Sequence, residues 1–323
     1  MATFPLPKEP PGTIGPRSAP ERSAGARGPQ VPGIVYVNGR FCSSDEASIS
    51  VFDHGLLYGD GVFEGIRIYN GRIFKLREHV ERMFRSAAGI GLDPGVSVAE
   101  MCDIVLETSA RSGLRDGYLR PLFTRGAGDL GLDPRKSKHP SVIVICSTIN
   151  PYGGKAETGV RLIISALRRT PPESLNPRIK SLNYLNSVLA KAEANARGAD
   201  DALLLDLKGN VAEASGENVF VVREGRLYSP PTTTNLEGIT RQTVVELAAG
   251  VIPFAERAFD PVFLTSSEEA FLSGTGAEVL PIVSVEGTPV GTGRPGPITR
   301  RLQRAYFELV RSTGAPIPYP GGD

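Results

Sequence analysis

Two Asn-Gly pairs, at residues 38–39 and 70–71, each separate two short runs of strand-forming residues. Asn and Gly tolerate the positive φ angles of a tight two-residue turn better than other residues do. Each pair therefore predicts a β-hairpin, one over residues 34–41 and one over 65–76. Hairpins of this kind favour antiparallel pairing and constrain the fold more than any other feature of the chain.

Helix and further strand signals alternate along the remaining sequence. Apolar residues recur at helical spacing over residues 76–90 and 98–112, and Ser97 and Glu100 form a capping box before the second segment. Further strands are expected over residues 117–124, 141–147, 160–165, 202–206, 219–222, 226–228, 269–272 and 282–285, and further helices over 184–197, 240–249 and 298–311. Because hairpins outnumber βαβ units, we expect an α+β fold with mixed sheets and packed helices.

Composition suggests how the chain is divided. Residues 1–32 are rich in Pro, Gly, Ala, Ser and Arg and poor in large apolar residues, so we expect a disordered tail. Residues 150–158 contain a Pro and two Gly and predict a linker. The linker would join a small N-terminal α/β domain, residues 33–149, to a large C-terminal domain, residues 159–315, with a second tail over 316–323.

Charge and cysteine content exclude several classes of function. The formal net charge is +1 and no basic run occurs, which argues against a nucleic-acid partner. No apolar stretch is long enough to cross a bilayer. The three cysteines and three histidines are scattered, so we expect neither a disulfide framework nor a metal site. Reduced thiols of this kind suit a cytoplasmic location.

Three short segments with glycine could approach a ligand closely. Residues 59–65 have the spacing GxGxxxG and lead into a strand, so we reject a dinucleotide site and interpret them most simply as a tight turn. Residues 237–241 precede an apolar helix, where Thr240 is a candidate N-cap and the helix start a candidate anion site. Residues 273–276 predict a turn between two strands, whose N–H groups could bind a carboxylate or phosphate.

Two ionisable residues could carry chemistry. Lys180 lies in a loop just before an apolar helix, and a lysine that enters a pocket can form a Schiff base, although most lysines are simply solvated. Glu213 lies between a strand and a hairpin, where the simplest interpretation is a solvated loop acid. Neither residue is distinctive by its spacing alone.

The order of the motifs along the chain is more informative than any one of them. Over residues 34–312 that order resembles the fold-type IV enzymes that depend on pyridoxal 5′-phosphate, and most of all the branched-chain amino acid aminotransferases. The segments that carry the resemblance are Tyr58–Arg67, Glu78–Arg82, Tyr118–Pro121, Lys180–Asn186, Glu213–Phe220, Gly238–Arg241 and Ser273–Glu278. The resemblance implies a transaminase that moves the amino group between L-Leu, L-Ile or L-Val and 2-oxoglutarate.

The resemblance also implies which residues hold the cofactor. Lys180 would bind pyridoxal 5′-phosphate as a Schiff base and later carry the transferred proton. Glu213 would pair with the pyridine nitrogen, and Arg82 would bind the phosphate. Tyr184 would lie beside the ring, while the N–H groups of Ile239 and Thr240 and the hydroxyl of Thr275 would complete the phosphate site.

The substrate contacts follow from the same resemblance. Tyr118 and the N–H groups of Thr275 and Gly276 would bind the α-carboxylate, and Arg120, supported by Arg67, would admit the distal carboxylate of glutamate. Gly276 stands where the family often has alanine, which leaves the N–H contact but loosens the turn. The apolar pocket would be lined by Tyr58, Phe63, Tyr152 and Tyr184. Leu130 and Leu132 would come from a second subunit, which implies a homodimer.

Other activities fit the same scaffold. A D-amino-acid transaminase, an (R)-amine transaminase or an aminodeoxychorismate lyase would share the fold and the lysine. The branched-chain interpretation is favoured by a set of residues comprising Tyr58, Phe63, Gly65, Arg67, Tyr118 and Arg120. A non-catalytic binding protein is a rival of another class, but such a protein has no need for Lys180, Glu213 and Arg82 together.

Overall fold

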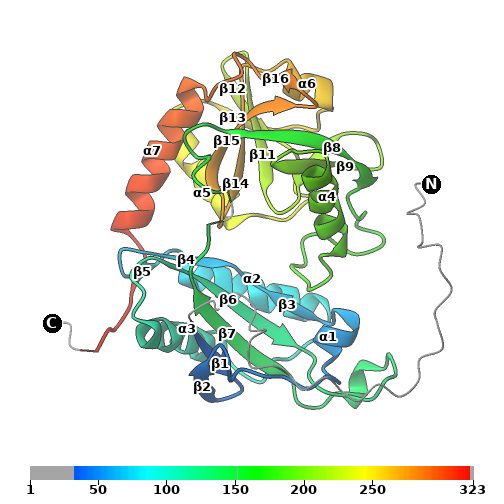
Figure 1. The fold of residues 1–323 in the computed structure, drawn as a ribbon, viewed down its shortest axis with the longest axis vertical. Coiled ribbons are helices and arrows are strands. Elements are labelled where there is room, and N and C mark those ends of the chain that lie inside the picture. The colour runs from blue at the N-terminus through cyan, green and yellow to red at the C-terminus, as the bar shows by residue number, and fades with distance from the viewer. Residues whose placement is uncertain (1–32, 151, 321–323) are drawn as a thin grey trace, which may run out of the picture. The chain divides into compact units, whose positions relative to one another are not determined.

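The computed structural model describes residues 33–150 and 152–320. Seven strands from the first half of the chain and one short C-terminal strand form an eight-stranded sheet (Figure 1). Its strand order is β17-β5-β4-β6-β7-β1-β2, with β3 paired to β6. The strands are β1 (Ile34–Val37), β2 (Arg40–Ser43), β3 (Gly61–Phe63), β4 (Ile66–Tyr69), β5 (Arg72–Ile73), β6 (Gly117–Thr124), β7 (Ser141–Ser147) and β17 (Ala315–Pro316). Both predicted hairpins are confirmed, and Asn38 and Asn70 have the positive φ that their turns require. The expected tail over residues 1–32 lies outside the described residues.

Helices α1 (His54–Tyr58), α2 (Leu76–Gly89) and α3 (Val98–Ser112) belong to the same half, with a 3₁₀ turn, η1 (Pro134–Lys136). The capping box at the start of α3 is confirmed, since Ser97 Oγ accepts from the Glu100 N–H and the Glu100 carboxylate accepts from the Ser97 N–H. Apolar residues of α2 and α3, among them Val80, Met83 and Val105, are buried against the sheet. This packing fixes the face of α2 that carries Arg82.

The second sheet has nine strands in the order β10-β9-β8-β15-β14-β11-β12-β13, with β16 paired to β15. Its strands are β8 (Val160–Arg168), β9 (Asp201–Leu205), β10 (Val211–Ala214), β11 (Asn218–Arg223), β12 (Arg226–Ser229), β13 (Phe254–Glu256), β14 (Glu269–Gly274), β15 (Glu278–Val285) and β16 (Thr288–Pro289). Strand β8 pairs in parallel with β9 and β15, and β12 with β13, whereas the other pairs are antiparallel. The sheet is therefore mixed, and the predicted α+β fold is confirmed.

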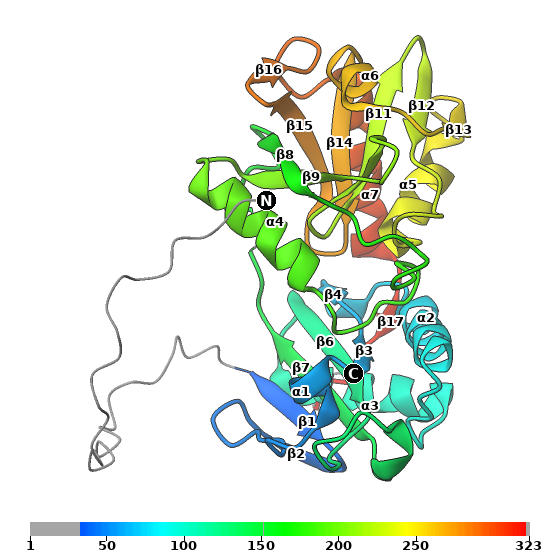
Figure 2. The same cartoon turned by 90° about the vertical axis from the view of Figure 1, so that its right-hand side faces the viewer.

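Four helices cover the second sheet: α4 (Leu185–Ala196), α5 (Ile239–Ala248), α6 (Pro261–Thr265) and α7 (Pro297–Ser312). Helix α4 packs against β8 and β9, and α5 and α7 pack against β14 (Figure 2), whereas α6 contributes Leu264 to a separate core. The alternating side chains of the strands explain the arrangement. On β11, Phe220 packs toward α5 and α7, while its neighbour Val219 packs into a separate core with Leu264 of α6. None of the helices within the described ranges is long and apolar enough to cross a membrane.

Two local predictions are wrong. The solvated-loop interpretation of Glu213 is wrong, because the residue lies in strand β10 and is buried, whereas its expected role in the site stays a prediction. Thr240 was expected to cap a helix, but Gly238 is the N-cap of α5 and Thr240 lies in the first turn.

The C-terminal segment returns to the first sheet. Ala315 and Pro316 pair with Ile73 and Arg72, Ile317 is buried, and the hydroxyl of Tyr319 donates to the Leu114 carbonyl at 2.6 Å. Its contacts join the region from Pro32 onward into one unit. The division of that unit into two domains at residues 150–158 stays a prediction.

Candidate active site

A cavity of about 250 Å³ is lined by residues from both sheets and from the starts of α4 and α5. Ten of the predicted site residues line it: Phe63, Arg82, Tyr118, Arg120, Lys180, Tyr184, Ile239, Thr240, Thr275 and Gly276. These residues come from six separate segments of the sequence, and the fold brings them together around one cavity.

Lys180 is held in this cavity by the loop before α4. Its backbone N–H donates to Ser86 Oγ at 3.1 Å, and its carbonyl accepts from the Phe63 N–H at 3.0 Å. Its amine donates to the hydroxyl of Tyr184 at 3.1 Å and lies 4.7 Å from the centroid of the Phe63 ring. Tyr184 is four residues further on, at the start of α4, and so both ends of the lysine side chain are fixed.

Arg82 reaches the cavity from α2. Its guanidinium donates to Glu64 through Nε at 2.7 Å and Nη2 at 2.8 Å, and through Nη1 to the Glu237 carbonyl at 2.7 Å. Glu64 also accepts from His79 Nδ1 at 2.8 Å. Burial raises the pKa of Glu64, but the charge of Arg82 and the His79 contact outweigh it, so that this pKa is well below its ordinary value. The buried carboxylate is thus charged and holds the arginine in place.

The start of α5 forms the neighbouring wall. Gly238 is the N-cap and no side chain caps the first turn. A Cβ at Gly238 would lie 2.1 Å from Asn218 Oδ1, so only glycine fits beside Asn218, whose amide donates to the Leu236 carbonyl at 2.9 Å. An uncapped helix start presents N–H groups that favour an anion.

A buried hydroxyl completes this end of the cavity. Ser273 is 1% exposed, lines the cavity, and its Oγ has no hydrogen-bond partner among the described residues. Buried polar atoms of this kind are rare unless a ligand satisfies them. Together with Arg82, the α5 start and Thr275, it makes a set of donors that fits a phosphate group.

The opposite wall is made by β6. Side chains two residues apart on a strand share a face, and Arg120 Nη2 donates to the hydroxyl of Tyr118 at 2.8 Å. The Arg120 guanidinium lies 4.6 Å from the Phe63 ring centroid, and its Nε is buried without a partner in the part of the chain that the structure describes. A Cβ at Gly65 would lie 2.1 Å from the Tyr118 hydroxyl, so the glycine makes room for that side chain.

Five other predicted residues do not line the cavity. Tyr58 donates to the Leu130 carbonyl at 2.6 Å, and Tyr152 donates to Asp201 at 2.6 Å. Arg67 lies 3.6 Å from the Glu278 carboxylate. The remaining two are Leu132, which is 78% exposed, and Glu213.

Glu213 lies directly behind the cavity wall. Its carboxylate accepts from Arg169 Nε at 2.5 Å and from the N–H of Leu236 at 3.2 Å, and Leu236 lines the cavity. Glu217, four residues later, lines the cavity itself. Burial, followed by the nearby charge of Asp201, raises the pKa of Glu217 to about 8.

The sequence interpretation passed over Glu64, His79, Glu217, Asn218 and Ser273. Signals for all five were present, because each of them stands inside a motif quoted for other reasons. His79 lies three residues before Arg82 on α2, on the same side of the helix. What the sequence could not give is the contact between these residues and their partners.

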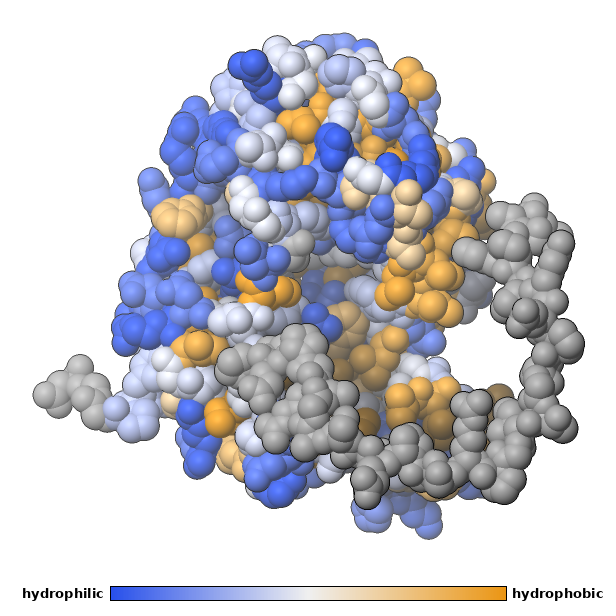
Figure 3. Space-filling model, viewed as in Figure 1, coloured by the Kyte–Doolittle hydropathy of each residue, from blue (hydrophilic) through white to orange (hydrophobic). Residues whose placement is uncertain are grey.

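An exposed apolar surface lies near the cavity on α1, α4 and the loop after β6. Figure 3 shows apolar side chains gathered over α4 and α1 on this face. Its members are Leu56, Leu57, Tyr58, Leu130, Leu132, Leu185, Val188 and Leu189, each between 37% and 78% exposed. Contiguous apolar patches of this kind typically mark a protein interface.

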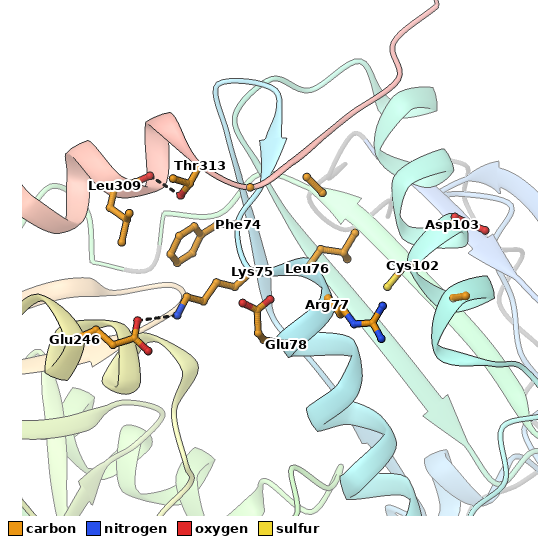
Figure 4. Close-up of a pocket in the computed structure, with 13 residues that line it drawn as sticks. Phe74, Lys75, Leu76, Arg77, Glu78, Cys102, Asp103, Glu246, Leu309 and Thr313 are labelled. Atoms are coloured by element: carbon orange, nitrogen blue, oxygen red, sulfur yellow. Dashed lines mark hydrogen bonds and ion pairs between the residues drawn. The ribbon is translucent and has the colours of Figure 1, made fainter.

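A larger cavity, of about 630 Å³, lies at the start of α2 (Figure 4). Its lining contains acidic and basic side chains together, and Lys75 Nζ lies 3.1 Å from Glu246 Oε2. No predicted site residue lines it. In the described ranges, no group of His, Cys, Asp and Glu side chains could hold a metal ion.

Comparison with known proteins agrees with this geometry. Residues 61–285 match the family model described as amino-transferase class IV. A Methanocaldococcus jannaschii relative, whose name gives branched-chain-amino-acid aminotransferase provisionally, is 45% identical over 285 residues (88% of this chain, 98% of the relative). The Pseudomonas aeruginosa branched-chain-amino-acid aminotransferase is 37% identical (86% of this chain, 93% of that protein). The crystal structure of the T.th. branched-chain amino acid aminotransferase with pyridoxamine 5′-phosphate has a TM-score of 0.83 at 39% identity (87% of this chain, 94% of that one).

Proposed function

We propose that this chain, which belongs to the class IV aminotransferases, is a branched-chain amino acid aminotransferase. Its cofactor is pyridoxal 5′-phosphate. The enzyme would move the amino group between L-Leu, L-Ile or L-Val and 2-oxoglutarate. The observation that carries the proposal is the placement of the Lys180 amine in the same cavity as the phosphate-binding set of Arg82 and the α5 start. Structures of the T.th. relative with N-(5′-phosphopyridoxyl)-L-glutamate and with 4-methylvaleric acid support both substrate classes.

The cofactor-side residues have separate tasks in this proposal. Bound pyridoxal 5′-phosphate supplies an electron-accepting ring, which makes removal of the Cα proton possible. Arg82 and the N–H groups at the start of α5 hold the phosphate, and the buried Glu64 keeps Arg82 in place. The Lys180 amine binds the cofactor covalently and afterwards carries the proton, and Tyr184 orients it through the 3.1 Å hydrogen bond.

Different residues bind the part that all substrates share and the side chains that differ between leucine and glutamate. The N–H groups of Thr275 and Gly276 bind the α-carboxylate that all substrates share. Phe63 offers an apolar surface to an aliphatic side chain, while Arg120 has a buried Nε free to meet the distal carboxylate of glutamate. Because Arg67 is already close to Glu278, Arg120 carries this second contact.

A homodimer belongs to the same proposal. The exposed residues of α1 and the loop that carries Leu130 and Leu132 form an apolar surface of the kind that marks a protein interface. We assign this surface to contact with a second copy, so that Leu130 and Leu132 close the cavity of the other subunit. The buried free cysteines, Cys42 and Cys146, favour the cytoplasm as its location.

The test is a half-reaction assay on the purified, cofactor-loaded protein. L-Leucine, D-alanine and (R)-phenylethylamine are each added without an oxo acid, and the absorbance of the bound cofactor is followed as it converts to the pyridoxamine form. Fast conversion with L-leucine alone is the expected result. Preference for D-alanine or the (R)-amine would overturn the substrate class, and no cofactor absorbance at all would overturn the enzyme proposal.

A further inference from the structure

We infer that Glu278 is a positioning residue for the substrate carboxylate. Its side chain fixes the turn of Thr275 and Gly276 to strand β4, so that the N–H groups of the turn are aimed into the cavity. The inference rests on the proposed function for the identity of the substrate, but its contacts are independent of that function.

The backbone at Glu278 is strained. Gly274 and Glu278 are the last paired residues of the β14–β15 hairpin, and the loop between them contains Thr275, Gly276 and Ala277. Glu278 has φ +59°, in the left-handed region that a residue with a Cβ seldom adopts. At Glu278, contacts of the side chain offset this strain.

Two side chains of β4 provide those contacts. The hydroxyl of Tyr69 donates to Glu278 Oε1 at 2.9 Å, and Arg67 Nη2 lies 3.6 Å from the same oxygen. Arg67 also lies over the Tyr69 ring, 4.9 Å from its centroid. Tyr69 is 2% exposed, and its burial raises the pKa of the phenol well above the ordinary value, so it remains a donor. The carboxylate is therefore held by a hydrogen bond and an ion pair from the other sheet.

This contact joins two walls of the cavity. Thr275 and Gly276 line it from the second sheet. Arg67 is the register partner of Tyr118, which lines it from the first sheet. Without the carboxylate, the turn loses its attachment to β4 and Arg67 loses its nearest anion. The contacts that hold Arg82 and the start of α5 do not pass through Glu278, so only Thr275 of the phosphate-binding set depends on this residue.

Three variants separate positioning from backbone strain. Glu278→Gly removes the carboxylate but fits the positive φ, so the turn still folds. Glu278→Gln keeps an acceptor for Tyr69 and removes the charge toward Arg67. Glu224→Gly is the matched control, because Glu224 also has a positive φ of 51° in a hairpin turn, while its side chain is 78% exposed.

Two readouts are measured on the cofactor-loaded proteins: steady-state kinetics with L-leucine and L-glutamate, and calorimetric binding of 4-methylvaleric acid. For Glu278→Gly we expect KM for both amino acids and Kd for the acid to rise about tenfold, with kcat within about twofold and a smaller loss of cofactor affinity, because Arg82 and the α5 start keep their contacts. Glu278→Gln should fall between this variant and the wild type, and Glu224→Gly should match the wild type.

Unchanged Kd and KM in Glu278→Gly would overturn the inference and leave Glu278 as a turn residue. A loss confined to glutamate would also overturn it, because it would assign Arg67 and Glu278 to the distal carboxylate. A wild type that binds the acid but does not react with L-leucine would contradict the proposed function, while the Kd comparison would still decide the inference.

Discussion

The carboxylate of Glu64 binds the guanidinium of Arg82 through two hydrogen bonds, of 2.7 and 2.8 Å, and both side chains are buried. The pairing is bidentate, which fixes the plane of the guanidinium as well as its distance. Arg82 therefore reaches the carbonyl of Glu237, just before α5, in a fixed orientation. The proposed phosphate site therefore depends on a carboxylate that does not itself line the cavity.

Glu64→Gln is expected to weaken cofactor binding and stability together. Removing one partner of a buried ion pair leaves an uncompensated charge and costs about 3–5 kcal/mol. Pyridoxal phosphate titration and thermal unfolding measure the two effects. Glu81→Gln is the control, since Glu81 forms an exposed pair with Arg77 on the same helix, and its loss should cost at most about 1 kcal/mol. Equal behaviour of the two variants would refute the role of Glu64.

Lys180→Ala is expected to abolish covalent attachment of the cofactor. In the wild type, borohydride reduction should fix pyridoxal phosphate to the chain, and mass spectrometry of the peptides should locate it at Lys180. Lys180→Ala should show no such adduct and lose transamination by at least about 10³-fold, because the amine is also the proton carrier. Lys208→Ala, at an exposed lysine, should behave like the wild type. An adduct on another lysine of the Lys180 variant would contradict the assignment.

Glu213→Gln and Glu217→Gln distinguish two candidate partners for the pyridine nitrogen. Glu213 is ion-paired with Arg169 and hydrogen-bonded to Leu236, a wall residue, and we expect it to take this role. Its variant should therefore slow the leucine half-reaction about 100-fold, because a neutral amide cannot keep the nitrogen protonated. Glu217→Gln should slow it less than about tenfold. The reverse order in stopped-flow absorbance would transfer the role to Glu217.

The pH dependence of stability should report on Glu217. Its pKa is raised to about 8 in the folded protein from 4.5, so the folded state binds the proton more tightly. The free energy of unfolding is therefore expected to fall as pH rises from about 4.5 to about 8. Denaturant unfolding at pH 5, 6.5 and 8 measures the slope. Glu217→Gln should flatten it, and an unchanged slope would assign the titration elsewhere.

Gly65→Ala is expected to displace Tyr118. The added Cβ would lie 2.1 Å from the Tyr118 hydroxyl, which must move and release Arg120. KM for L-glutamate should rise about tenfold or more, with a loss of stability of about 1–3 kcal/mol. Gly250→Ala is the control, because nothing lies within 4 Å of a Cβ there. If Gly65→Ala kept the wild-type KM, the wall at β6 would have no part in substrate binding.

Local signals were enough to predict much of the fold. The capping box gave α3 its correct bounds, and the Asn-Gly pairs gave both hairpins. Short elements such as α1, with five residues, and β3, with three, carry too few residues to show a period, and none was predicted. Their conformation depends on contacts with other parts of the chain.

The resemblance predicted which residues belong to the site, but not the contacts that each of them makes with distant partners. Lys180, Arg82 and Tyr184 meet in one cavity as expected. Glu213 can be buried because Arg169, 44 residues earlier in the sequence, neutralises its charge. No residue near Glu213 in the sequence predicts that partner. Thr240 has the preferred side chain for a cap, but Asn218 occupies the space beside Gly238 and the helix begins there instead.

The pairing of β17 with β5 has a consequence for synthesis of the chain. Strand β5 is complete once residue 73 has been made, but its neighbour at 315–316 arrives only after the whole second sheet. Until then one border of the first sheet has unpaired backbone groups, which invite association with other chains. A nascent chain on the ribosome therefore carries an open edge while residues 74–314 are made, and we expect C-terminal truncations at residue 313 to aggregate where truncations at residue 320 do not.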